Sequence, residues 1–111
     1  MRVLMTHRHK SGAPSVPPSP ELFAEMGQLI EDMTKAGVLI TTGGFGPASK
    51  GVRLKFDGGK MSVIDGPFTE AKEMIAGFAL VEVKSIDEAV EWAPRFARLV
   101  GDVEIDIRSL S

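Results

Sequence analysis

Two segments with helical periodicity alternate with short apolar strand segments, and this order constrains the fold more than any other feature. Apolar side chains recur at three- and four-residue steps across residues 22–33. Ser19 and Pro20 stand in front of them, and a serine followed by a proline is typical of a helix start. Gly37 supplies a left-handed stop. The sequence therefore predicts a helix that fills the space between Ser19 and Gly37, with one apolar stripe.

The second helical segment begins with a capping box. Ser85 is followed three residues later by Glu88, and apolar residues continue to Trp92. Pro94 removes a backbone amide and crowds the preceding turn, so we expect it to kink or end this helix. A further helical turn is expected over residues 96–100.

Strand-like segments occupy the remaining apolar stretches. A strong hairpin turn, Asp57-Gly58-Gly59, joins the third of them to the fourth. Residues 78–81 are apolar on both faces, which places the fifth strand inside the sheet. Residues 8–18 are polar and rich in proline, and they predict a loop. The six predicted strands cover residues 2–7, 38–42, 51–56, 60–64, 78–83 and 102–108.

This order predicts a single α+β domain spanning residues 1–111. Right-handed crossovers arrange it as a split βαβ, ferredoxin-like sheet with both helices on one face. The opposite face still carries apolar side chains and needs a cover. The simplest cover is a second copy, packed sheet to sheet as a two-fold homodimer.

Composition removes several classes of function. The chain has no cysteine, which excludes disulfides and thiol nucleophiles and fits a cytoplasmic location. A net charge of -2 does not indicate the positively charged surface that binds DNA or RNA. No apolar run is long enough for a signal peptide or a membrane span. The glycines at positions 43–46 do not form a phosphate-binding or dinucleotide-binding fingerprint, so no cofactor is expected.

The segment Asp65-Gly66-Pro67-Phe68-Thr69-Glu70-Ala71-Lys72-Glu73 carries more chemistry than a plain connection needs. In one interpretation the Asp65 carboxylate accepts hydrogen bonds from backbone amides in an Asx-type turn, and Phe68 packs into the core. In the other, Asp65 is a general base or the partner of a histidine. Glu70 and Glu73 share a helical face and form a weak acid-base or metal candidate, against a solvated, charge-balanced turn.

His7 is the candidate general base near the sheet, because its ordinary pKa lies close to neutrality. We expect it to act together with Asp65. His7 and His9 would also point to the same face of a strand, where they form half of a metal site, although a solvated or interface role is more common for such histidines. Arg53 can pair with a substrate carboxylate or phosphate, or with a cross-strand acid such as Glu82 or Glu104.

A family resemblance adds to these interpretations. Residues 63–73, then Ala76-Gly77-Phe78 and residues 87–92, are similar to the DGPF-domain branch of the YCII-related proteins. The segments Gly46-Pro47-Ala48-Ser49 and Val52-Arg53 match the region upstream of the motif in that branch. The resemblance implies a dimeric α+β barrel of ferredoxin-like subunits. It also implies a histidine and an aspartate in a cleft, for which members have been suggested as enzymes, and an association with sigma factors in some members.

Two functional hypotheses follow. The first is a small-molecule-binding protein, acting as an enzyme with His7 and Asp65 as the acid-base pair, and with Arg53, Phe68 and Glu70 contacting the substrate. The second is a non-catalytic dimerising or regulatory module, in which the DGPF segment shapes the interface. A cleft that brings His7 and Asp65 within reach of each other would favour the enzyme.

Overall fold

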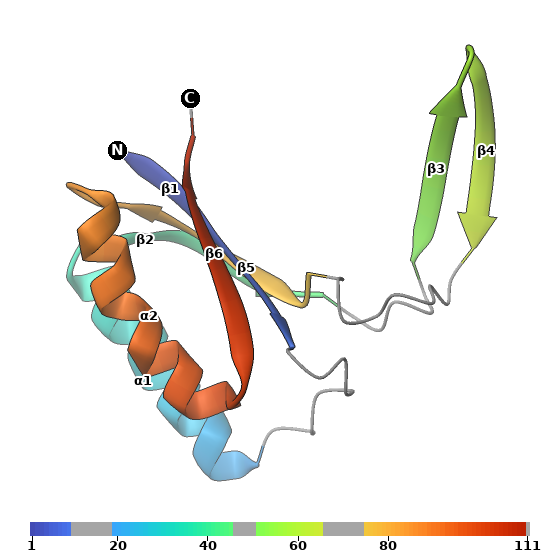
Figure 1. The fold of residues 1–111 in the computed structure, drawn as a ribbon. Helices are drawn as coiled ribbons and strands as arrows, with labels where there is room; N and C mark the ends of the chain where they lie inside the picture. Colours follow the sequence, from blue (N-terminus) through green and yellow to red (C-terminus); the bar gives the residue numbers. More distant parts are fainter. Residues whose placement is uncertain (10–18, 46–50, 66–74, 111) are drawn as a thin grey trace.

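The computed structural model describes residues 1–9, 19–45, 51–65 and 75–110, and Figure 1 shows their arrangement. The predicted order of strands and helices is confirmed for these residues. The elements are β1 (Arg2–His9), α1 (Pro20–Lys35), β2 (Leu39–Gly44), β3 (Val52–Asp57), β4 (Lys60–Asp65), β5 (Gly77–Glu82), α2 (Ile86–Val100) and β6 (Val103–Ser109).

Four strands form the main sheet in the order β2-β5-β1-β6, and all three pairings are antiparallel. Both helices lie on the same side of this sheet (Figure 1), as the sequence predicts. The position of β5 between β2 and β1 confirms that this strand is internal. The chain is thus a mixed α+β fold, compatible with the expected ferredoxin-like arrangement, whereas the dimeric barrel stays a prediction.

The hairpin of β3 and β4 forms a separate two-stranded sheet. Gly58 and Gly59 have positive φ angles of 57° and 79°, which confirms the predicted glycine turn. Figure 1 shows the hairpin beyond one end of the four-stranded sheet, and it takes no part in that sheet's hydrogen bonding. The sequence predicts both strands and their turn, but it does not indicate that they leave the main sheet.

The first helix begins as predicted, since the Ser19 hydroxyl accepts a hydrogen bond from the amide of Leu22 at 3.1 Å. Its buried residues are Leu29 and Met33. The prediction of one apolar stripe is wrong at Phe23, which is 71% exposed, and at Ile30. Phe23 follows Leu22 and Ile30 follows Leu29. Each residue of an α-helix is rotated by about 100° from the one before it, so these two side chains point away from the core.

The second helix does not end at Pro94 but runs on to Val100. An end at Pro94 is therefore wrong, whereas the helical conformation expected over residues 96–100 is confirmed. Phe96 and Leu99, beyond the proline, pack against the buried core, and this burial offsets the hydrogen bond that proline cannot make. At the start of the helix the Ser85 hydroxyl accepts from the Glu88 amide at 3.3 Å. The Glu88 carboxylate in turn accepts from the amide of Lys84, one residue before the expected partner.

The first strand is longer than predicted. Arg8 and His9, which the sequence assigns to the loop, pair with Glu104 and Val103 of β6. Strand pairing satisfies their backbone groups, so the polar side chains do not stop the strand. The rest of the predicted loop, like the predicted helical turn after Asp65, lies outside the described residues.

The core lies between the helices and one face of the four-stranded sheet. Val3 of β1 and Val81 of β5 are directly paired and completely buried there. The remaining buried residues are Met5, Leu29, Met33, Val38, Val83 and Ala89. The other face of the sheet has no helix over it among the described residues.

Candidate functional site

The open face of the four-stranded sheet is defined by the alternation of side chains along β1. Val3 and Met5 are buried under the helices, so Leu4 and Thr6 point to the opposite side. The register places Leu80 beside Leu4 and Phe78 beside Thr6. These side chains are half-buried with nothing from α1 or α2 above them. The centre of the open face is therefore apolar.

A charged cluster borders this apolar centre. The two terminal nitrogens of Arg8 bind Asp106 Oδ2 at 2.6 Å and Glu104 Oε2 at 3.0 Å. The hydrogen bond that Arg8 donates to Asp106, followed by the charge of that carboxylate, raises the pKa of Arg8 above its ordinary value. Arg108 lies opposite Leu4 on the same face, so the β6 side of the open face carries two guanidinium groups and two carboxylates and suits a polar or hydrogen-bonding group.

Sequence reasoning missed this cluster, although a signal was present. The acidic residues of β6 alternate with apolar ones, and Arg8 stands at the far end of another strand. The prediction places Arg8 in the loop 8–18, so it gives no indication that Arg8 meets the acidic residues of the last strand. Antiparallel pairing of β1 with β6 brings the three together on the open face.

Phe45 extends the apolar centre toward the end of the sheet. Its ring lies 6.0 Å from that of Phe78, and it is 60% exposed. Its amide donates to the carbonyl of Ala76 at 2.8 Å, and the amide of Ala76 donates to the carbonyl of His7 at 2.7 Å. The chain therefore leaves β2, and returns before β5, at the His7 end of the sheet.

His7 itself lies on the covered side of the sheet. It alternates in phase with Val3 and Met5, and its ring packs 4.6 Å from the ring of Phe96 on α2. Gly77 is its partner in the register, and a side chain there would meet the imidazole at 2.5 Å. Burial, with a smaller contribution from the charge of His9, lowers the pKa of His7 below 6.5. The neutral imidazole, which can accept a proton, is thus the favoured form near pH 7.

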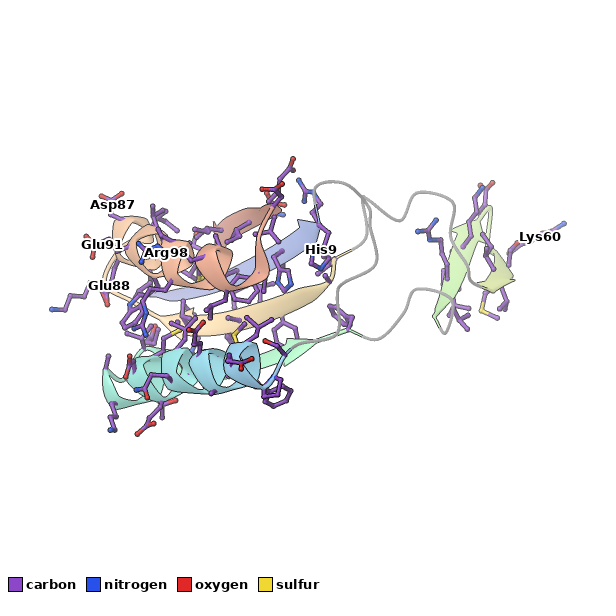
Figure 2. All side chains as sticks on the ribbon, turned by 90° about the horizontal axis from the view of Figure 1, so that it is seen from below. His9, Lys60, Asp87, Glu88, Glu91 and Arg98 are labelled. Carbon is purple, nitrogen blue, oxygen red and sulfur yellow. The ribbon has the colours of Figure 1, made fainter. Side chains whose placement is uncertain are left out.

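His9 stands edge-on to His7, with 6.0 Å between the ring centres, and Figure 2 shows it at the end of β1 nearest the hairpin. Within residues 1–9, 19–45, 51–65 and 75–110, no three histidine, aspartate or glutamate side chains gather as metal ligands. The predicted half-site at His7 and His9 therefore gains no third ligand from the described part of the chain.

The other predicted site residues belong to the hairpin and to the segment after it. Arg53 lies on β3 opposite Ile64, in a different sheet from Glu82 and Glu104. The backbone of Asp65 closes β4 opposite Val52. The side chain of Asp65, and all of Phe68 and Glu70, lie outside the described residues, so the predicted pairing of His7 with Asp65 stays a prediction.

Comparison with known proteins gives a family and one relative. The model of the YCII-related domain matches residues 1–100. A protein of Rhizobium meliloti (strain 1021), described as uncharacterized, is 40% identical over 47 residues. That match covers 42% of this chain and 38% of the relative's length. Neither of the two described helices is long and apolar enough to cross a membrane.

Proposed function

Because this chain belongs to the YCII-related family, we propose that it is a small-molecule-binding protein that works as a two-fold dimer. The ligand would lie between the open faces of two sheets. The observation that carries this proposal is the one-sided cover of the sheet, which leaves Leu4, Phe78 and Leu80 without a helix over them. A second copy would remove this apolar surface from water.

The chemistry of the open face suggests the class of ligand. An apolar centre of aliphatic and aromatic side chains suits a hydrophobic body of small size. The neighbouring cluster of Arg8, Glu104 and Asp106 has spare carboxylate lone pairs for a polar, hydrogen-bond-donating group. We therefore infer an amphipathic small molecule, with its polar end toward the β6 edge of the sheet.

The catalytic form of this proposal uses His7 and Asp65 as an acid-base pair. Two observations support it: the neutral form of His7 is favoured, and the segment after Asp65 returns to the described structure close to the His7 backbone. The segment that begins at Asp65 re-enters the described structure at Ile75, next to Ala76, whose amide is bonded to the His7 carbonyl. Arg53, Phe68 and Glu70 remain the proposed substrate contacts.

One observation favours the alternative, a non-catalytic dimerising or regulatory module. The ring of His7 packs against Phe96 on the helix side, and no other histidine belongs to the described open face. A ligand bound on that face would be held by apolar and ion-paired groups without a nearby general base. The module would then bind a small molecule as a signal rather than transform it.

The test combines oligomeric state with ligand retention. Light scattering after size exclusion should give a dimer at micromolar concentration. Leu80→Arg places a charge in the centre of the open face and should yield folded monomers. Arg98→Glu changes an exposed residue of α2 (Figure 2) and should leave the dimer intact. Native mass spectrometry should detect a retained small molecule that Leu80→Arg releases. A wild-type monomer would contradict the dimer, and a dimer indifferent to Leu80→Arg would contradict its placement on this face.

A further inference from the structure

The β3–β4 hairpin carries an apolar face that its own chain does not cover. Side chains alternate along both strands, and the register pairs Leu54 with Val63 and Phe56 with Met61. Val52 lies on the same side, so five apolar residues share one face. Their exposed fractions run from 51% at Leu54 to 69% at Phe56. The opposite face carries Arg53, Lys55, Asp57, Lys60, Ser62 and Ile64.

Such a face is unusual in a protein that stays alone in water. A two-stranded hairpin with no further packing is marginally stable. The exposed parts of these five side chains amount to roughly 500 Å², the upper range for the largest apolar patch of a monomer. The alternation is also nearly complete, since Ile64 is the one apolar residue among those on the side that carries the cations. The hairpin is therefore patterned to bury one face and to keep the other in water.

We propose that this apolar face packs on a second copy of the same chain, so that each hairpin is an arm that reaches across the dimer. The inference rests on the dimer of the proposed function and identifies which segment completes it. The receiving surface would be Phe45 and Phe78 at the end of the partner's open face, which leaves Leu4 and Leu80 for the sheet-to-sheet contact of the proposed dimer. This is the end of the sheet from which the hairpin departs.

The area favours a copy of this chain as the occupant. In a two-fold dimer both hairpin faces are buried, one from each protomer. The exchange then buries roughly 1,000 Å² of hairpin surface in total, which with the surfaces that receive it exceeds the roughly 1,000 Å² expected of a specific interface. A single hairpin on an unrelated partner would bury only half of this. The cations Lys55 and Lys60 stay on the outer face of the arm, and Figure 2 shows Lys60 pointing away at the far end of the hairpin.

The first experiment measures dimer dissociation by sedimentation equilibrium. The double variant Leu54→Asp/Phe56→Asp charges the apolar face, and Lys55→Asp/Ser62→Asp is the matched control on the other face. We expect the first to weaken the dimer by at least about tenfold, as for central interface residues, and the control to change it little. Circular dichroism should show both variants folded, because these residues lie outside the buried core.

Photocrosslinking tests the contact without depending on a destabilised variant. The photoreactive residue benzoylphenylalanine replaces Phe56 in one protein and Lys55 in another. The probe at position 56 should give covalent dimers, with crosslinked peptides that contain Phe45 or Phe78, and the probe at position 55 should not.

The outcomes separate this inference from the proposed dimer. The packing of the hairpin on the partner would be refuted if Leu54→Asp/Phe56→Asp left the dissociation constant of the dimer unchanged. It would also be refuted if the probe at position 56 crosslinked only within its own chain. Neither result would contradict the dimer through the open face. A wild-type monomer would overturn both. Equal crosslinking to the partner from positions 55 and 56 would refute the assignment of the apolar face as the contact.

Discussion

Gly77 is closely surrounded, and an added side chain there would meet both a side chain and a backbone carbonyl. A Cβ atom there would lie 2.5 Å from His7 Cε1, 2.9 Å from the carbonyl oxygen of Gly43 and 3.3 Å from His7 Nδ1. His7 cannot simply swing away, because its ring is already packed against Phe96. The Gly43 carbonyl belongs to β2, which is paired with β5. We therefore predict that Gly77→Ala is destabilising, although alanine is the smallest possible change.

The magnitude follows from two opposing effects. Overpacking a well-packed site costs about 1–3 kcal/mol in the free energy of unfolding. Replacing glycine reduces the freedom of the unfolded chain and returns about 0.4–1 kcal/mol. The net loss should be about 1–2 kcal/mol, which lowers the Tm of a domain of this size by roughly 4–10 °C. Urea unfolding followed by circular dichroism measures the first quantity, and a thermal scan measures the second.

A double-mutant cycle identifies the cause of the loss. If the imidazole is the main obstacle, Gly77→Ala should cost less in a His7→Ala background than in the wild type. The relief should be partial, because the Gly43 carbonyl remains in place. Gly27→Ala is the control: it lies on α1 with nothing within 4 Å and should gain about 0.5–1 kcal/mol. Full stability of Gly77→Ala, or an equal cost in both backgrounds, would refute the predicted packing of His7 on Gly77.

Three further predictions concern individual side chains. The pKa of His7 is lowered in the folded protein, so the stability that the neutral imidazole contributes is complete above pH 6.5 and is lost as the pH falls from there through the folded-state pKa. The Tm of His7→Phe should therefore fall less between pH 8 and pH 5 than the Tm of the wild type. An equal fall in both proteins would refute this. Hydrogen bonds from Arg95, then from Gln28, lower the pKa of Asp32. In an NMR titration Arg95→Met should raise the pKa of Asp32 more than Lys35→Met does. The reverse order would contradict the ion pair between Asp32 of α1 and Arg95 of α2. Ser85→Ala removes the cap of α2 and should cost about 1 kcal/mol in urea unfolding, whereas unchanged stability would show that the cap contributes little.

The features that could be predicted from the sequence are those that nearby residues determine. Periodicity and capping residues define α1, and its start at Pro20 after Ser19 follows from contacts only three residues apart. The turn at Gly58 and Gly59 is equally local. The internal place of β5 in the strand order was also predictable, because a run of apolar residues favours a central strand over an edge strand.

The errors arise where distant residues decide the outcome. Pro94 has a local cost that favours ending α2, yet the packing of Phe96 and Leu99 on the core carries the helix past it. Similarly, the polarity of Arg8 and His9 favours a loop, whereas pairing with β6 extends the strand. In both cases a contact from another part of the chain outweighs a local preference that the sequence shows clearly.

The candidate site depends on a further step that periodicity alone does not provide. Alternation shows that His7 shares a face with Val3 and Met5, and that Arg8 shares the other face with Leu4. It does not show which face the helices cover. Once Val3 is known to be buried, His7 must lie on the helix side and Arg8 must face the open side. A ligand bound on the open face would therefore meet Arg8 and its two carboxylates directly, and His7 can reach it only around the end of the sheet, where the chain leaves for the hairpin.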